Sequence, residues 1–268
     1  MAQAWRIVTY NTWKCDGLYR DRLNWMGQAL SDLSPDIVCL QEAFDCPSGP
    51  ADTVGHLASV LGMQSEVLAA REKTRRFEGK EQLSKSNLAI LSNRPMTRQD
   101  NVKLADHDED QDRWAMQVIL SATPGTSLRV VNTHLSHLRG KKGDTLRRIQ
   151  AQQLHAELNT ASHETVVFCG DLNDEWESPN LSALHKRDWL KPDHEQEGAT
   201  FLGAREDGTC TQRRIDAVQV TTGCECSASL RRRFPALNTP VGPNREYPSD
   251  HAAIVVDLEF SSQDEEGA

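Results

Sequence analysis

The 268-residue sequence has no apolar run that approaches the ~20 residues needed to cross a bilayer, and its mean hydropathy is −0.59. These two features exclude a protein with transmembrane helices. The first residues, MAQAWRIVTYNTW, also lack the basic and apolar segments of a signal peptide. We therefore expect a cytoplasmic protein with no membrane partner, whose first strand begins near the N-terminus.

Positive charge is scarce as well, because 30 Lys and Arg stand against 39 Asp and Glu, a net charge of −9. Proteins that bind duplex DNA non-specifically usually have a basic surface, so the charge speaks against that class. The basic residues nevertheless gather in segments 71–85, 139–148 and 231–233. We expect the first two to border a site that attracts an anionic substrate, and the third to be ordinary solvated surface.

The seven cysteines form neither a disulfide framework nor a clear metal site. Cys39 and Cys169 lie in apolar runs and are expected to be buried as small hydrophobic residues. Without an export signal, the thiols are expected to be free. The pair Cys224 and Cys226 lacks the second Cys/His pair that a structural zinc ion requires, so no zinc is expected there.

Short apolar, β-branched runs recur along the whole chain, with helical patterns between them. The apolar residues Leu23, Met26, Leu30 and Leu33, at spacings of three, four and three, predict a helix over 21–33. A similar spacing predicts another helix over 145–158. The runs 114–120 and 128–135, separated by SATPGTS, predict a β-hairpin.

The interleaving of strands and helices indicates a single layered α/β domain over residues 1–260. No repeat or low-complexity linker divides it. The polar, acidic segment 261–268 is expected to be a disordered tail.

Polar side chains follow the apolar runs at the points where the predicted strands begin or end. They are Asn11, Glu42, His134, Asp171, Asn173, Asp216, Asp250 and His251. Because loops at strand ends of a layered α/β fold gather on one side of a rigid scaffold, we expect one shared site. Carboxylate and amide oxygens suit Mg²⁺ or Mn²⁺ rather than zinc. Together with histidines that transfer protons or stabilise charge, they predict a phosphoester hydrolase.

Six short motifs also occur in a characteristic order. They are TYNTW (9–13), LQE (40–42), NTHL (132–135), GDLND (170–174), RIDAV (214–218) and SDH (249–251). From Asn11 to His251 the chain thereby resembles the endonuclease/exonuclease/phosphatase superfamily, which includes pancreatic-type DNases, sphingomyelinases, inositol-phosphate phosphatases and poly(A)-shortening nucleases. The resemblance implies a four-layer α/β/β/α sandwich of two packed, mainly antiparallel sheets flanked by helices, with the site at one end of the sheets.

The resemblance also implies a role for each motif residue. Glu42 would be the main ligand of the Mg²⁺ cofactor, for which Mn²⁺ is the alternative, and Asn11 and Asp250 would complete or support the metal site. His251 would be the general base, with Asp216 holding its tautomer and raising its basicity.

Three further residues complete the set that the resemblance implies. Asp171 and Asn173 would orient the attacking water and contact the phosphate, and His134 would stabilise the pentacovalent phosphate. Arg147 and Gln150, on the helix that follows, are expected to be structural.

Other polar residues near these motifs are given no site role. His137 lies outside the motif, Asp174 and Glu175 are expected to be solvated turn residues, and 106–112 is expected to be a solvated acidic loop rather than a calcium site. DNase-like members place a glutamate just before the strand that here reads SKSNLAILS. Asn87 or a backbone carbonyl is therefore expected to orient His134 in its place.

Three functions remain open at this point. The favoured one is a metal-dependent phosphodiesterase or phosphatase that acts on a phosphorylated small molecule or single-stranded nucleic acid. The second is a DNase-like endonuclease, and the third is a non-catalytic binding module on the same fold. The complete set of catalytic residue types speaks against the third.

Overall fold

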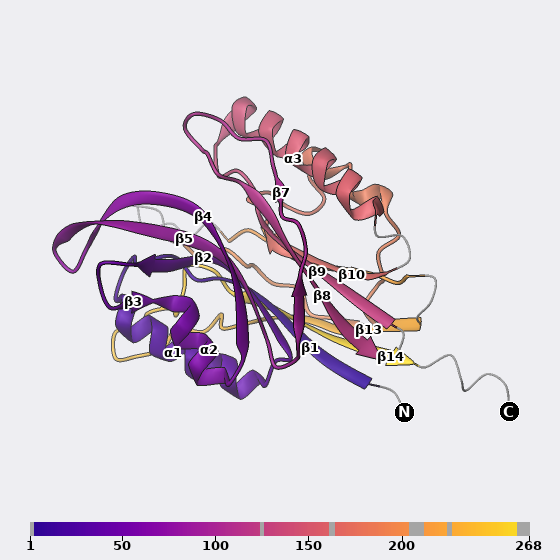
Figure 1. Ribbon diagram of the computed structural model, residues 1–268, viewed down its shortest axis with the longest axis horizontal. Coiled ribbons are helices and arrows are strands. Elements are labelled where there is room, and N and C mark those ends of the chain that lie inside the picture. The colour runs from indigo at the N-terminus through magenta and orange to yellow at the C-terminus, as the bar shows by residue number, and fades with distance from the viewer. Residues whose placement is uncertain (1–2, 124–125, 161–163, 204–211, 224–226, 262–268) are drawn as a thin grey trace, which may run out of the picture.

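In the computed structural model the two sheets pack face to face, and helices lie against their outer faces (Figure 1). The structure describes residues 3–123, 126–160, 164–203, 212–223 and 227–261. Most of the expected acidic tail and the pair Cys224 and Cys226 lie outside these residues.

The first sheet has eight strands in the order β11-β13-β14-β1-β2-β5-β4, with β3 paired to β2. Its strands are β1 (Gln3–Asn11), β2 (Ile37–Cys46), β3 (Ala51–Asp52), β4 (Gln64–Phe77), β5 (Lys80–Ser92), β11 (His194–Glu195), β13 (Ser227–Ala236) and β14 (Ala253–Ser261). Most neighbours are antiparallel, but β1 runs parallel to β2 and β11 runs parallel to β13. The sheet is therefore mixed.

The second sheet has six strands in the order β12-β10-β9-β8-β6, with β7 paired to β8. Its strands are β6 (Met96–Arg98), β7 (Val102–Lys103), β8 (Trp114–Thr123), β9 (Thr126–His134), β10 (Thr165–Asp171) and β12 (Asp216–Thr221). Strands β8 and β9 are antiparallel neighbours, which confirms the predicted hairpin. Strands β9 and β10 are parallel.

Both predicted helices are present, as α1 (Tyr19–Leu33) and α3 (Gly140–Thr160). The sequence did not predict α2 (Thr53–Leu61), whose first turn is capped by the Asp52 side chain. Two 3₁₀ turns, Pro179–Leu181 and Leu184–Lys186, follow β10. None of the helices that the structure describes is long and apolar enough to span a membrane.

Three apolar layers hold the sandwich together. The central layer joins side chains of both sheets, among them Trp5, Ile7, Met116 and Val218, and it contains Cys39 and Cys169. A second layer lies between the first sheet and the helices α1 and α2, and a third lies between the second sheet and α3. The four-layer α/β/β/α architecture is thus confirmed.

Parallel pairing brings the strand ends to one edge of each sheet. In the first sheet β1 and β2 end side by side, so that Asn11 lies opposite Gln41. In the second sheet Asp171 lies opposite both His134 of β9 and Asp216 of β12. Since the two sheets pack face to face, these polar ends meet at one rim of the sandwich.

Candidate active site

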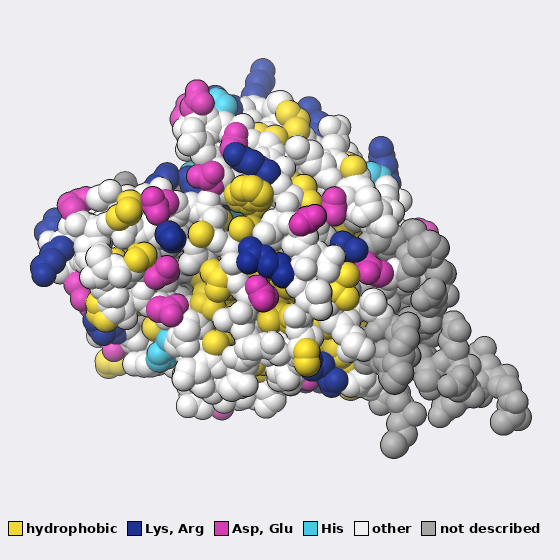
Figure 2. All heavy atoms as spheres, viewed as in Figure 1, with side chains coloured by type: hydrophobic (Ala, Val, Ile, Leu, Met, Phe, Trp, Pro, Cys, Tyr) yellow, Lys and Arg dark blue, Asp and Glu magenta, His cyan; other side chains and the backbone are white. Residues whose placement is uncertain are grey.

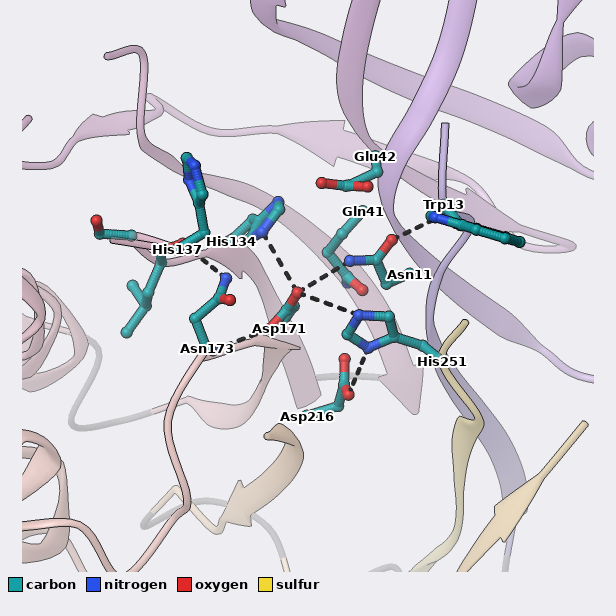
Figure 3. A network of polar contacts seen from close by, with 12 residues as sticks. Asn11, Trp13, Gln41, Glu42, His134, His137, Asp171, Asn173, Asp216 and His251 are labelled. Carbon is teal, nitrogen blue, oxygen red and sulfur yellow. Dashed lines mark hydrogen bonds and ion pairs between the residues drawn. The ribbon is translucent and has the colours of Figure 1, made fainter. Parts of the chain in front are cut away.

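Asp171 is the centre of this rim. It is the last residue of β10 and is buried. Its Oδ2 accepts a hydrogen bond of 2.9 Å from Asn11 Nδ2 and lies 3.3 Å from His134 Nε2 and 3.8 Å from His251 Nε2 (Figure 3). Its Oδ1 accepts a hydrogen bond of 2.8 Å from the backbone N–H of Asn173. Residues from four predicted motifs thus converge on one carboxylate.

The pair of His251 and Asp216 lies directly behind Asp171. His251 Nδ1 is 2.8 Å from Asp216 Oδ2, so the other ring nitrogen points towards Asp171 (Figure 3). Burial opposes protonation of His251, but the carboxylates of Asp216 and Asp171 outweigh it and raise its pKa to about 10. Burial, followed by the charge of Asp216, raises the pKa of Asp171 to about 7. At neutral pH the ring of His251 is therefore protonated, whereas Asp171 is able to exchange a proton.

His134 is held in the opposite electrostatic state. Burial, followed by the positive charges of Arg113 and Arg71, keeps its pKa well below the usual range, so its ring is neutral. The expected partner Asn87 does not orient it: within the described part of the chain, Asn87 Oδ1 is buried and makes no hydrogen bond. Asp171 is the side chain next to the ring instead, and Arg113 Nη1 donates to the backbone carbonyl of His134.

Glu42 and Asp250 lie close enough to influence each other. Burial raises the pKa of Asp250 to about 6, with the charge of His251 opposing this shift and the charge of Glu42 adding to it. Lys14 Nζ lies 3.0 Å from Glu42 Oε2 and offsets part of this negative charge. A buried carboxylate whose ionisation is disfavoured by a neighbouring carboxylate is stabilised by a hard cation, so the oxygens of Glu42 and Asp250 fit a divalent metal.

A second group of potential ligands lies deeper in the site. Asp171, Asp216 and His251 offer ligand atoms within 4.8 Å of one another. His251 Nδ1 is bonded to Asp216 Oδ2, while Asp216 Oδ1 is buried and makes no hydrogen bond to the described residues. Because a protonated His251 is not a metal ligand, Glu42 and Asp250 remain the better metal donors.

Backbone strain is concentrated around these side chains. Of the nine described non-glycine residues with positive φ, four lie at the site: Trp13 at 57°, Lys14 at 40°, Glu42 at 55° and Asn173 at 52°. Glu42 sits where the pairing of β2 with β5 shifts register between Leu40 and Ala43. Such conformations cost roughly 1–3 kcal/mol each and persist where the surrounding structure fixes them, often at functional sites.

The family of the chain follows from comparison with known proteins. A sequence model of the endonuclease/exonuclease/phosphatase family matches residues 8–251. The chain belongs to this family. A search of curated protein sequences found no match.

Solved structures of this family share the fold at low sequence identity. Sphingomyelinase C from Streptomyces griseocarneus is 22% identical with a TM-score of 0.69, over 95% of this chain and 99% of that one. A mannosyl-6-phosphatase from Bacteroides thetaiotaomicron is 18% identical with a TM-score of 0.66, over 95% and 99% of the two chains. TDP2 from C. elegans is 15% identical with a TM-score of 0.63, over 96% and 75%.

The acidic loop 106–112 is largely exposed, as expected, at Asp106, Asp108, Glu109 and Gln111, but one of its carboxylates is not solvated. Asp110, within 106–112, is fully buried. Its Oδ1 lies 3.1 Å from Arg71 Nη1, while Ser136 Oγ donates to its Oδ2 at 2.6 Å. Arg113 and His137 also contact it. The expectation was wrong for Asp110 because Arg71 and Ser136, both distant in sequence, pair with it together with the nearby Arg113.

Asp174 is also buried rather than solvated. It accepts hydrogen bonds of 3.0 Å from Arg147 Nε and 2.9 Å from Asn180 Nδ2. Arg147 and Gln150 are structural, as predicted, because both bond to the backbone of the loop that follows His134. Residues 172–174 directly after β10 are therefore packed, whereas Glu175 is exposed, as predicted.

Two of the three basic segments behave as expected. Arg71 lies close enough to His134 to lower its pKa, and the charge of Asp171 acts on Arg139, so 71–85 and 139–148 border the site. The third segment is solvated only in part, because Arg233 is buried, with Nη2 3.0 Å from Gln219 Oε1 and Nη1 3.3 Å from Glu195 Oε1.

Sequence reasoning missed the bridge that joins the two sheets under the site. Gln41 Nε2 donates to Asn132 Oδ1 at 2.7 Å, and Asn132 Nδ2 donates to the carbonyls of Leu40 and Ala89. Gln41 lies in the LQE motif and Asn132 in the NTHL motif, so their place in these motifs could have indicated a contact near the site. Lys14 was missed too, although it follows TYNTW directly.

Proposed function

We propose that this chain is a divalent-metal-dependent phosphoester hydrolase. The single observation that supports this most is the convergence of Asn11, His134 and His251 on the buried carboxylate of Asp171. Asp171 can act as a base, and the protonated ring of His251 and the neutral ring of His134 lie next to it. This arrangement suits a reaction in which water attacks phosphorus. The phosphoester chemistry of the solved relatives, a sphingomyelinase and a mannosyl-6-phosphatase by name, is consistent with this class.

In the proposed mechanism, Asp171 accepts the proton of the attacking water. Its raised pKa, about 7, matches the working pH of a general base. Asn173 is fixed beside it, since its Nδ2 donates to the carbonyl of Leu135 at 3.1 Å, and it orients the water.

His251 takes a different role from the one expected from the sequence. With a pKa raised to about 10, its ring already carries a proton and does not accept one at neutral pH. We assign it to donate its Nε2 proton in a hydrogen bond to a phosphoryl oxygen, with Asp216 stabilising the positive ring. Neutral His134 supplies a second ring on the other side of Asp171.

The metal in this proposal is Mg²⁺, or Mn²⁺ as the alternative, held by Glu42 and Asp250 with Asn11 beside them. When bound, it supplies positive charge to the phosphoryl oxygens. Glu42 and Asp250 would hold the cation, whose charge would take over the neutralisation of Glu42 that Lys14 now supplies.

The test is hydrolysis of bis(4-nitrophenyl) phosphate and of 4-nitrophenyl phosphate by the purified protein, with Mg²⁺ and with a chelator. We expect metal-dependent turnover of at least one of the two, which also separates a diesterase from a monoesterase. Asp171→Asn and His251→Ala should each lower the rate by roughly 10²–10⁴-fold. Asp188→Asn, at an exposed aspartate, is the control and should keep the wild-type rate.

Two outcomes contradict the proposal. One is turnover of neither ester at any metal concentration. The other is near wild-type turnover by a folded Asp171→Asn protein, which would remove this carboxylate from the chemistry.

A further inference from the structure

One arginine next to the candidate active site holds the structure together. Arg147 is buried, and its guanidinium donates four hydrogen bonds of 2.7–3.0 Å. They go to the carbonyls of Ser136 and Leu138 and to the carboxylates of Asp144 and Asp174. Since a guanidinium has only five N–H groups to donate, Arg147 has little left to offer a ligand.

Arg213 lies at the same corner but is not bonded in this way. Its Nη2 is 3.9 Å from Asp174 Oδ1 and its Nε is 3.6 Å from Glu175 Oε1, both beyond hydrogen-bond distance. The two oxygens of Asp174 already accept shorter bonds, from Arg147 and from the backbone N–H of Glu175. The side chain of Arg213 is 26% exposed, so a ligand can reach it.

The backbone directs Arg213 towards the catalytic residues. Phe201 pairs in antiparallel register with both Arg213 and His251, and residues directly opposite each other in such pairs project from the same face. The ring of Phe201 accordingly packs edge-on against the ring of His251, with 5.2 Å between centroids. The side chain of Arg213 therefore projects from the face that carries His251, and its contact with Asp174 places its guanidinium at the turn that follows Asp171.

A second arginine, Arg139, lies near the same turn. It directly precedes α3 and follows Leu138, whose carbonyl is bonded to Arg147. Its side chain is partly buried and makes no hydrogen bond or ion pair with a described residue. Burial, followed by the positive charge of Arg213, lowers the pKa of Arg139, and the charge of Asp171 opposes this shift. The two guanidinium groups thus lie close enough to repel each other.

The neighbouring carboxylates do not relieve this repulsion, because they have closer partners. Asp174 is bonded to Arg147, and Asp216 is bonded to the protonated ring of His251. Elsewhere, on the face that Figure 2 shows, Lys and Arg side chains are interspersed with Asp and Glu rather than gathered in one patch. A partly buried charge without a hydrogen-bonded partner costs free energy, and an anion that bonds to both guanidinium groups would recover it.

We propose that Arg139 and Arg213 form an arginine clamp, which binds the phosphoryl oxygens of the substrate and selects a phosphoryl group with two negative charges over one with a single charge. The proposal rests on the proposed function and names the residues that decide between its two ester classes. A phosphate monoester carries its second negative charge above a pKa of about 6, whereas a diester has one charge and one fewer free oxygen. Planar guanidinium groups bind such oxygens in pairs.

The first experiment compares kcat/KM for 4-nitrophenyl phosphate with kcat/KM for bis(4-nitrophenyl) phosphate in Mg²⁺. Arg139→Gln and Arg213→Gln should each lower the ratio of the monoester value to the diester value by about 10-fold. Arg213→Lys keeps the charge but loses the planar fork, so it should restore part of the ratio. A wild-type protein that cleaves only the diester, or a ratio that neither glutamine variant changes, would overturn the proposal.

Arg98→Gln is the matched control. Arg98 also makes only a long ion pair, 3.8 Å to Glu66, but it lies on β6 at the opposite edge of the second sheet from β12. This variant should keep the wild-type ratio. If Arg139→Gln does not fold, Arg213→Gln still decides, because the guanidinium of Arg213 donates no hydrogen bond to a described residue.

A binding measurement separates the arginine clamp from the chemistry. At a pH of about 8, phenylphosphonate carries two charges, whereas its monomethyl ester carries one. In calorimetric titration, metal-free protein should bind the dianion about 10-fold more tightly than the monoanion. Arg213→Gln should abolish this preference and Arg98→Gln should retain it.

The two experiments together distinguish the possible failures. If neither nitrophenyl ester is cleaved but the phosphonate preference is found and depends on Arg213, the arginine clamp stands and the proposed hydrolysis fails. If the esters are cleaved but the metal-free protein binds both phosphonates equally, the arginine clamp fails and the proposed function stands. A preference that survives in Arg213→Gln also overturns the arginine clamp.

Discussion

At the scale of the residue, the site is organised by charges that cannot all be satisfied at once. Asp171, Asp216 and His251 are all buried within a few ångströms of one another. Their environment raises the pKa of Asp171 and of His251 together, so the protonated imidazole stabilises one carboxylate while the other retains affinity for a proton. Environments that separate the proton affinities of neighbouring groups often identify the acid and the base.

The ionisation of Asp250 allows the cost of burying these charges to be measured as a change in the free energy of unfolding. Burial raises its pKa to about 6, so its protonated form is favoured in the folded protein. The stability that this provides is fully present below the unfolded pKa, near 4, and is lost as the pH rises through about 6. In a chelator, Asp250→Asn should therefore increase the free energy of unfolding by roughly 1–3 kcal/mol at pH 7.5. Urea unfolding measures this change.

The same variant supplies its own internal check. At pH 4 the gain should largely disappear, because the carboxyl is then protonated in the folded protein and about half protonated in the unfolded chain. The exposed control Asp188→Asn should show no gain at either pH. With saturating Mg²⁺ the order should reverse, because only the wild-type carboxylate binds the cation. A gain at pH 4 as large as at pH 7.5 would rule out ionisation as its cause.

At the scale of the element, the site depends on how closely β9 and β10 approach each other. Gly170 precedes Asp171, has a φ of +146°, and a Cβ there would lie 2.0 Å from the carbonyl oxygen of Thr133. No side chain fits between the strands at this point. Glycine is therefore required at position 170, the first of the GDLND motif, because it allows the close approach of the strands that sets the distance between Asp171 and His134.

Substitution of this glycine tests the requirement. Gly170→Ala should lower the free energy of unfolding by more than about 3 kcal/mol and abolish activity, because β9 and β10 must separate. Gly79→Ala is the matched control, since Gly79 also has positive φ, +79°, but has open space around it. It should cost only about 1–2 kcal/mol and leave activity unchanged. Equal losses would show that φ alone, and not the contact with Thr133, fixes the glycine.

Local sequence patterns predicted the helices and strands but not every contact between them. Periodicity gave α1 and α3, and the apolar runs gave the strands, because each signal is local. The convergence of Asn11, His134 and Asp171 followed from the rule that strand ends share a rim and from the family resemblance. The burial of Asp110 and the contact of Lys14 with Glu42 depend on the register between distant strands, which no local pattern records.

At the scale of the whole molecule, net charge and internal pairing limit the substrate. Many arginines are already paired with carboxylates of the same chain, among them Arg6, Arg20, Arg71, Arg113, Arg129, Arg147, Arg231 and Arg232. These pairs reduce the positive charge that is available to contact a phosphate backbone on a protein whose net charge is −9. A small or single-stranded substrate needs few such contacts, whereas the DNase-like alternative needs many.

The salt dependence of DNA binding separates these two alternatives. Each phosphate neutralised on duplex DNA contributes about 0.9 to the slope of log affinity against log salt, and on single strands about 0.7. For the inactive Asp171→Asn protein we expect a slope equivalent to roughly one to three phosphates, and weaker binding to a duplex than to a single strand of equal length. Fluorescence anisotropy of labelled oligonucleotides between low and moderate salt measures both. Because the acidic surface repels a long polyanion, a duplex slope equivalent to more than about five phosphates would favour the DNase-like endonuclease instead.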